Sequence, residues 1–220
     1  MKLHPFLLSA AFIVLSFALA TSVQAHQPRF VKDDQLVLIK NSEVSQAFYG
    51  ELKGRAAFYL IDLKTAQELY FQILAPDLPG IRKDKTVTVD YLSDLGAKVE
   101  SFLTLDPISA DWQSFHEEYG GDNYLAGPSA KKPGEAGYYI VKISSPDNTG
   151  KYVLVAGEKE TFSAEEIARA LITIPQLKTK FFNKPFWQSF QGKVGKYFGL
   201  SFLGLVVFGY LFHRFRRMFR

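Results

Sequence analysis

The chain has 220 residues and no cysteine, and its 26 basic and 22 acidic side chains give a formal net charge of +4. The lack of cysteine excludes disulfide bonds, thiol catalysis and lipid attachment through cysteine. All acidic residues lie between Asp33 and Glu166, and over residues 26–166 they outnumber the 15 lysines and arginines. Such an acidic region lacks the basic surface that nucleic acids require, so no nucleic-acid partner is expected.

The first 25 residues have the pattern of a secretory signal peptide. Lys2 supplies a positive charge, residues 5–20 are mostly apolar, and Ala25 ends a small-residue cleavage site. Cleavage there would make His26 the first residue of the mature chain. We therefore expect residues 1–25 to be removed and the region that follows them to act outside the cytoplasm.

Residues 26–160 are predicted to form an exported, all-β head, an antiparallel β-sandwich that is jelly-roll-like. Segments rich in aromatic and β-branched residues are typical of strands, and they span residues 35–40, 56–63, 68–74, 86–92, 98–105, 138–144 and 151–156. Val87, Val89 and Tyr91 alternate with period two and share one face. Many short strands at this spacing favour a sandwich or jelly roll.

Two segments of the head depart from the strand pattern. Val44, Ala47 and Phe48 have helical spacing, so residues 43–49 are predicted as a short helix or an irregular edge. Residues 111–134 contain no convincing strand and are predicted as a long loop, a feature that is often functional. Its aromatic, acidic and amide side chains suit a glycan or a protein partner, and the candidate ligand-binding residues are Trp112, Glu117, Glu118, Tyr119, Asp122, Asn123 and Tyr124.

Other interpretations of this loop stay open. Its carboxylates and Asn123 could bind calcium, although their spacing is not that of an EF-hand. The aromatic residues could instead pack the loop onto the sandwich while the carboxylates face water. A membrane-tethered hydrolase could use acidic residues of the 116–123 loop, namely Glu117, Glu118 or Asp122, but the chain has no Gly-x-Ser-x-Gly motif.

A copper site is a further alternative. If cleavage follows Ala25, the imidazole and the free amine of His26 lie together at the mature N-terminus, and His116 is the only other histidine of the head. Copper(II) prefers such nitrogen-rich ligands. No cofactor is expected otherwise.

The C-terminal part is predicted to bind the membrane. Residues 161–192 are predicted as a basic, amphipathic juxtamembrane helix or stalk that starts at a Ser163 cap, with Glu166 three residues later. Residues 193–212 are predicted as one transmembrane helix and residues 213–220 as a cytoplasmic tail. The uncharged run covers only residues 197–212, so the helix must extend back toward Val194. The anchoring residues are Lys193, Lys196, Arg214, Arg216, Arg217 and Arg220.

Two pairs of segments carry a family resemblance. Residues 54–63 with 69–73, and residues 137–143 with 150–155, resemble the early hairpin and the closing strand pair of bacterial pre-peptidase C-terminal domains and related carbohydrate-binding jelly rolls. Members of that family are non-catalytic accessory modules of exported enzymes, so the resemblance implies a binding or scaffolding head. The long 111–134 segment departs from the compact, Asp-rich middle of those domains. The arrangement from signal to tail also looks like uncharacterised bacterial single-pass surface proteins.

These observations predict a membrane-anchored extracytoplasmic protein that binds or scaffolds and does not catalyse. Its expected location is the cell membrane, with one span, the head outside and the C-terminus in the cytoplasm. The expected partners are membrane lipid and a glycan or a protein outside the cytoplasm.

Overall fold

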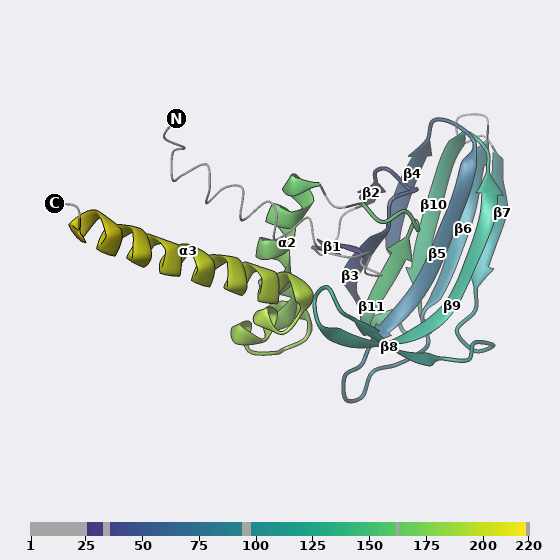
Figure 1. Ribbon diagram of the computed structural model, residues 1–220. Coiled ribbons are helices and arrows are strands. Elements are labelled where there is room, and N and C mark those ends of the chain that lie inside the picture. The colour runs from purple at the N-terminus through teal and green to yellow at the C-terminus, as the bar shows by residue number, and fades with distance from the viewer. Residues whose placement is uncertain (1–25, 33–35, 94–97, 162, 219–220) are drawn as a thin grey trace.

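The computed structural model describes residues 26–32, 36–93, 98–161 and 163–218, so the predicted signal peptide lies outside the described residues. The described strands form two sheets that pack face to face (Figure 1). The first sheet has the order β1 (Gln27–Phe30), β3 (Gln46–Lys53), β11 (Thr149–Ala156), β5 (Gln67–Pro76), β9 (Asp122–Gly134) and β8 (Gln113–Glu117). The second has the order β2 (Val37–Ile39), β4 (Ala57–Leu63), β10 (Gly137–Ser144), β6 (Thr86–Ser93) and β7 (Lys98–Leu105).

The strand pairing is nested along the chain. Four antiparallel pairs enclose one another in sequence: β3 with β11, β4 with β10, β5 with β9, and β6 with β7. Along this nest the chain alternates between the two sheets, as in a jelly roll. The predicted jelly-roll sandwich is therefore present, with β8 as an added antiparallel edge. The parallel edge strands β1 and β2 were not expected in a purely antiparallel sandwich.

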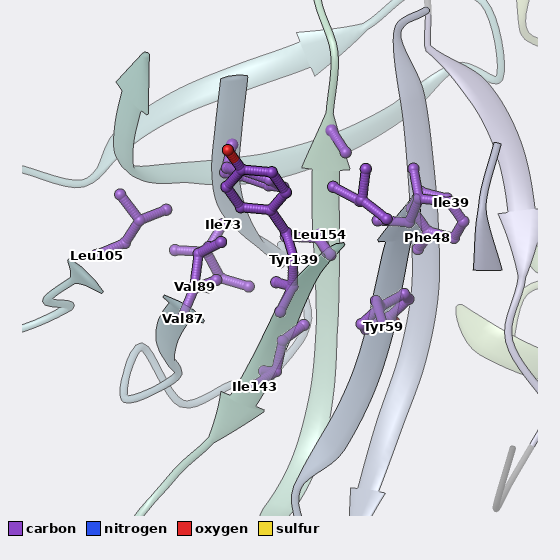
Figure 2. Packing of buried hydrophobic residues seen from close by; sticks show 14 of the residues in the cluster. Ile39, Phe48, Tyr59, Ile73, Val87, Val89, Leu105, Tyr139, Ile143 and Leu154 are labelled. Carbon is purple, nitrogen blue, oxygen red and sulfur yellow. The ribbon is translucent and has the colours of Figure 1, made fainter. Parts of the chain in front are cut away.

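A closely packed apolar core fills the space between the sheets. Figure 2 shows Tyr59, Val89, Ile143 and Leu154 among the residues that meet there, and each of these four side chains is fully buried. The hydroxyls of Tyr59 and Tyr152 lie 2.9 Å apart and hydrogen-bond to each other. This pairing matters because a buried hydroxyl without a partner costs about 1–3 kcal/mol.

A helical layer covers the outer face of the first sheet. It consists of α2 (Ala164–Gln176), η2 (Leu177–Phe181), η3 (Phe186–Phe190) and the start of α3 (Lys193–Met218), and the rest of α3 extends away from the sandwich (Figure 1). A second apolar cluster joins this layer to the sheet, and its members include Ala47, Tyr49, Val153, Val155, Leu177, Phe181 and Phe182. Both faces of β3 and β11 are therefore buried.

This double burial explains an error in the predicted strands. Residues 43–49 were predicted as a short helix or irregular edge, but Gln46–Lys53 is the strand β3. Phe48 and Leu52 face the core between the sheets, whereas Ala47 and Tyr49 face the helical layer. A strand that is buried on both faces shows no polar–apolar alternation, so its period-two signal disappears.

The predicted start of the C-terminal helix is confirmed. Ser163 is the N-cap of α2, and its hydroxyl accepts a hydrogen bond of 3.2 Å from the backbone N–H of Glu166. We expect Ser163→Ala to lower the free energy of unfolding by about 1 kcal/mol, because one N–H of the first turn loses its acceptor. Urea denaturation would measure this loss. Ser163→Asp keeps an acceptor and is the matched control, so an equal loss in both variants would contradict a capping role.

The predicted transmembrane helix is wrong. Within the described part of the chain, no helix is both long enough and apolar enough to cross a membrane. The predicted transmembrane helix had to include the first turn of α3 to be long enough. Val194 in that turn, however, is only 6% exposed and packs with Ala170 and Ile174 of α2. The remaining uncharged run, residues 197–212, covers about 24 Å at 1.5 Å per residue, less than the roughly 30 Å of a bilayer core. The transmembrane and single-pass assignments are corrected with it.

Candidate functional site

The segment predicted as a long loop is a β-hairpin. Residues 113–117 form β8, residues 122–134 form β9, and the two strands pair with His116 opposite Asn123 and Glu117 opposite Asp122. The prediction of a strandless segment at 111–134 is therefore wrong. The strands were missed because acidic side chains occupy inward positions where a strand normally has apolar residues. The segment therefore lacks the alternating pattern that indicates a strand.

Strand alternation divides the predicted ligand-binding residues between two faces. Asp122 and Tyr124 point toward the helical layer and are 4% and 2% exposed. Asn123 lies on the other face, where its Oδ1 is 2.6 Å from Nδ1 of the exposed His116. The seven predicted residues thus do not form one exposed surface.

Charged side chains from the helical layer meet the inward face of the hairpin. We call Glu117, Asp122, Lys178 and Lys184 the ion cluster; the first three are buried, whereas the side chain of Lys184 is 30% exposed. Oδ2 of Asp122 is 2.7 Å from Nζ of Lys178, and its Oδ1 is 2.9 Å from Nζ of Lys184. Lys178 belongs to η2 and also donates to the backbone carbonyl of Gly121 over 3.2 Å. These contacts attach the C-terminal helical layer to the hairpin.

The two lysines are the residues that the sequence analysis missed. Lys178 has no exposed surface, and burial lowers the pKa of its amine while the carboxylate of Asp122 opposes that shift. In the sequence these lysines stand among aromatic residues and resemble a lipid-facing pattern. The signal in the sequence was the position of Lys178, four residues after Ile174 and three before Phe181, which is the spacing of one helical face.

Glu117 is held at the hairpin end by backbone donors. Its Oε1 accepts from the N–H of Tyr119 over 2.9 Å, and its Oε2 accepts from the N–H of Gly120 over 2.7 Å. Burial nevertheless raises the pKa of Glu117 to about 7, because desolvation of the carboxylate outweighs these hydrogen bonds and the nearby Asp122 adds to the rise. The group therefore exchanges its proton near neutral pH.

Two buried tyrosines complete the polar interior. The hydroxyls of Tyr49 on β3 and Tyr124 on β9 lie 2.9 Å apart and hydrogen-bond to each other. Burial raises the pKa of both phenols well above the ordinary value, so both stay protonated. Tyr124 thus acts inside the protein and is not a surface contact.

The turn of the hairpin also holds the start of α3. The N–H of Lys193 donates to the carbonyl of Glu118 over 2.9 Å, and the side chains of these two residues form an ion pair. Gly121 has φ +73°, and a Cβ on it would lie 2.8 Å from the backbone nitrogen of Gly192. This close backbone approach requires glycine at 121.

The remaining predicted residues of the segment have structural contacts as well. Trp112 is half-buried, packs against the core between the sheets and donates from Nε1 to the carbonyl of Pro107 over 3.1 Å. Tyr119 packs beside the small apolar cluster of Ala170, Ile174 and Val194. The structure therefore uses these rings for packing.

The two histidines of the copper hypothesis lie on different sides of the hairpin. His26 lines a cavity of about 10 Å³ with Glu117 and Asp122, and its Nδ1 is 2.6 Å from the hydroxyl of Ser45. Burial lowers the pKa of His26 to about 4. His116 belongs to the opposite, exposed face. Among the described residues, no group of three or more histidine, cysteine, aspartate and glutamate side chains could hold a metal ion.

All but one of the predicted membrane-anchoring residues lie near the two ends of α3, and Arg220 is outside the described residues. Lys193 pairs with Glu118, whereas Lys196, Arg214 and Arg217 are exposed. The side chains of Arg216 and Arg220 lie outside the described part of the structure. Their role in anchoring stays a prediction.

A much larger hollow than that beside His26 lies at one edge of the sandwich. We call it the edge groove: a space of about 980 Å³ between β1, β2, β3 and α2. Arg29 on β1 and Glu166 on α2 form an ion pair of 2.8 Å beside it. Leu36 and Leu38 line the groove and are 61% and 47% exposed.

Comparisons with known proteins find only distant structural similarity. No protein-family model matches the chain, and no curated protein matches it. A solved pre-peptidase C-terminal domain of a collagenase from Bacillus anthracis is 12% identical and covers 57% of this chain and 97% of that one, with a TM-score of 0.35. CorA, a surface-associated copper-binding protein of Methylomicrobium album BG8, is 8% identical and covers 60% and 98%, with a TM-score of 0.27. Both matches fit the weak resemblance predicted from the sequence.

Proposed function

We propose that the protein is a non-catalytic binding module that holds an extended segment of a protein partner in the edge groove. The observation that carries this proposal is the groove itself, which is open, apolar along β2 and bordered by charged residues. Its expected setting outside the cytoplasm rests on the signal-peptide pattern of residues 1–25.

The form of the groove favours a peptide. β2 is the outermost strand of its sheet, and an extended segment can add to such an edge through main-chain hydrogen bonds. Leu36 and Leu38 then offer apolar surface to alternate side chains of the partner. A glycan would need exposed aromatic rings to lie against. Of the two aromatic residues that line the groove, Phe48 is only 2% exposed, and Phe30 is partly buried against the second apolar cluster.

The charges of the groove favour an acidic partner. Its acidic residues are engaged within the protein, since Glu166 pairs with Arg29 and Glu165 pairs with Arg169 over 2.8 Å. Lys32 and Lys40 also line the groove and are exposed. Among the lining residues that the structure describes, basic side chains therefore exceed acidic ones, and they suit a segment that alternates apolar and acidic residues.

A labelled eight-residue peptide of alternating valine and glutamate tests this proposal on the full chain by fluorescence anisotropy. We expect saturable binding that weakens with added salt, because the lysine contacts are screened. Leu36→Asp should weaken it about tenfold or more, since burial of one leucine contributes roughly 1.5–3 kcal/mol and the new charge repels the peptide.

Val99→Asp is the matched control for this experiment. Val99 is also 61% exposed, but it belongs to β7 at the opposite end of the same sheet order. It should leave the affinity for the peptide unchanged. Equal losses in both variants, or no saturable binding by the unchanged protein, would overturn the proposal.

A further inference from the structure

The part of α3 that extends away from the sandwich is apolar and uncovered (Figure 1). Over residues 198–210, every large apolar or aromatic side chain is exposed except the half-buried Leu205. Apolar surface this continuous is rare on water-soluble monomers and usually marks an interaction site. This stretch of α3 is therefore the surface of the molecule that most needs a partner.

The cations of α3 lie at the two ends of one of its sides. Lys196 and Arg214 are 18 positions apart, which is about five turns of an α-helix, so they point the same way. Leu205 is nine positions from each of them, or about two and a half turns, and lies on the opposite side. Phe198 and Phe202 lie near Leu205 by the same spacing. One side of α3 thus has charged ends, and the side opposite is aromatic.

The distribution of apolar side chains favours lipid over a second copy of the chain. Leu203 is seven positions after Lys196 and shares its side, whereas Phe202 points elsewhere, and both are exposed. A neighbouring helix would cover only one of these sides. Lipid chains can cover all of them, and a helix that is apolar all round is ordinarily buried.

The charges of the same region favour an anionic membrane. After Glu166 the sequence contains no acidic residue. Lys196, Arg214 and Arg217 are exposed, so their ammonium and guanidinium groups are accessible to lipid phosphates. Each lysine or arginine near an anionic membrane surface contributes about 1 kcal/mol of attraction.

The short helix η3 adds aromatic rings beside the start of α3. Phe186 and Trp187 are 56% and 59% exposed, and η3 packs against α3. The ring of Phe186 meets that of Phe190 edge to face, with centroids 6.0 Å apart. Tryptophan in particular is enriched at the level of the lipid headgroups.

We propose that η3 and α3 form a lipid-binding surface that lies in one leaflet of an anionic membrane and does not cross it. A helix that lies along the leaflet keeps Lys196 and Arg214, about 27 Å apart at 1.5 Å per residue, at the headgroups of the same side. Its aromatic side then faces the acyl chains. None of the residues that line the edge groove belongs to η3 or α3, so this surface is separate from the proposed peptide site.

Flotation of the full chain with vesicles tests the lipid surface. We expect the protein to bind vesicles of phosphatidylcholine with about 30% phosphatidylglycerol at least about tenfold more tightly than vesicles of phosphatidylcholine alone. Arg214→Gln should weaken binding to the anionic vesicles about fivefold, because one lipid-facing cation is lost. Equal binding to both kinds of vesicle would overturn the charge argument.

Phe202→Asp tests the apolar contribution. It should weaken binding about tenfold or more, since it removes a phenylalanine and places a charge among the acyl chains. Val99→Asp is the matched control: Val99 is also 61% exposed but belongs to β7 of the other sheet, so vesicle binding should not change. Both substitutions are at exposed positions, and unchanged circular dichroism would show that the variants are folded.

The absence of cysteine from the chain allows a test of how α3 lies. In vesicle-bound Arg217→Cys, a thiol reagent that does not cross membranes should react from outside, because both ends of α3 stay in the outer leaflet. Protection of this cysteine until the vesicles are dissolved would overturn the proposal, since α3 would then cross. Failure to bind vesicles, together with self-association that Phe202→Asp abolishes, would also overturn it and assign the surface to a second copy.

Discussion

Replacement of Asp122 by asparagine is expected to lower the free energy of unfolding by about 3–5 kcal/mol, the usual effect of removing one partner from a buried ion pair. Asp122 is 4% exposed and faces two amines, with Lys178 at 2.7 Å and Lys184 at 2.9 Å. An asparagine keeps the shape but removes the carboxylate that is paired with the buried ammonium of Lys178. The helical layer should then loosen from the sheet.

Urea denaturation and amide hydrogen exchange of η2 would measure this effect. Asp147→Asn is the matched control: its side chain is 50% exposed and pairs with Arg82 at the surface, where solvent screens the charges, so its loss should be much smaller. Removal of both charges, as Asp122→Leu with Lys178→Met, should restore much of the stability. A loss from Asp122→Asn no larger than that from Asp147→Asn would show that the ion cluster does not hold the layer.

The second large effect concerns pH. Because the folded state raises the pKa of Glu117 from 4.5 to about 7, it holds this proton more tightly than the unfolded chain does. The contribution of this proton to the free energy of unfolding is fully present below pH 4.5 and is lost as the pH rises through 7. The change is about 3 kcal/mol, at 1.36 kcal/mol per pKa unit. His26 acts in the opposite sense. Its pKa falls from 6.5 to about 4, so its contribution is present above pH 6.5 and is lost as the pH falls through 4.

Glu117→Gln should therefore expose the histidine effect. Between pH 4.5 and 6.5 the two titrations oppose each other, so the unchanged protein should show a shallow slope of stability with pH, followed by a fall toward pH 7. The glutamine variant should instead gain stability up to about pH 6.5 and then level off, even though its overall stability drops with the lost Gly120 contact.

Urea denaturation at fixed ionic strength across pH 4 to 8 would test this reversal. Glu118→Gln is the matched control, because Glu118 is the adjacent carboxylate and its side chain is 52% exposed. Its pH profile should keep the shape of the unchanged protein. A glutamine variant at 117 that still loses stability between pH 6 and 8 would contradict the assignment of that fall to Glu117.

The sandwich could be predicted where burial is one-sided. In β6, Val87 and Val89 are fully buried and are flanked by the more exposed Thr86, Thr88 and Asp90, so the alternation is visible in the sequence. β3 lacks this signal because a helical layer covers its second face. The sequence around β3 does not indicate that a helical layer covers it, because the layer consists of residues more than 100 positions later in the chain.

The candidate site was harder to predict because its partners are distant in sequence. Lys184 contacts Asp122 across 62 positions, and no spacing rule connects them. The C-terminal aromatic residues posed a related difficulty. Phe181 and Phe182 are buried against the sheet, whereas Trp187 is 59% exposed. Composition alone does not separate rings that pack on protein from rings that face outward.

The nested strand order has a consequence for how the chain can assemble. β10 and β11 are the last strands to be synthesised, yet β10 lies between β4 and β6, and β11 lies between β3 and β5. Until both have emerged, each sheet consists of two halves with unpaired edges along the middle. Pairing of β3 with β11 also joins segments about 100 residues apart, which is typical of slow folding. A chain that ends before Gly137 lacks both strands and is therefore not a smaller version of this domain but two unjoined halves of each sheet.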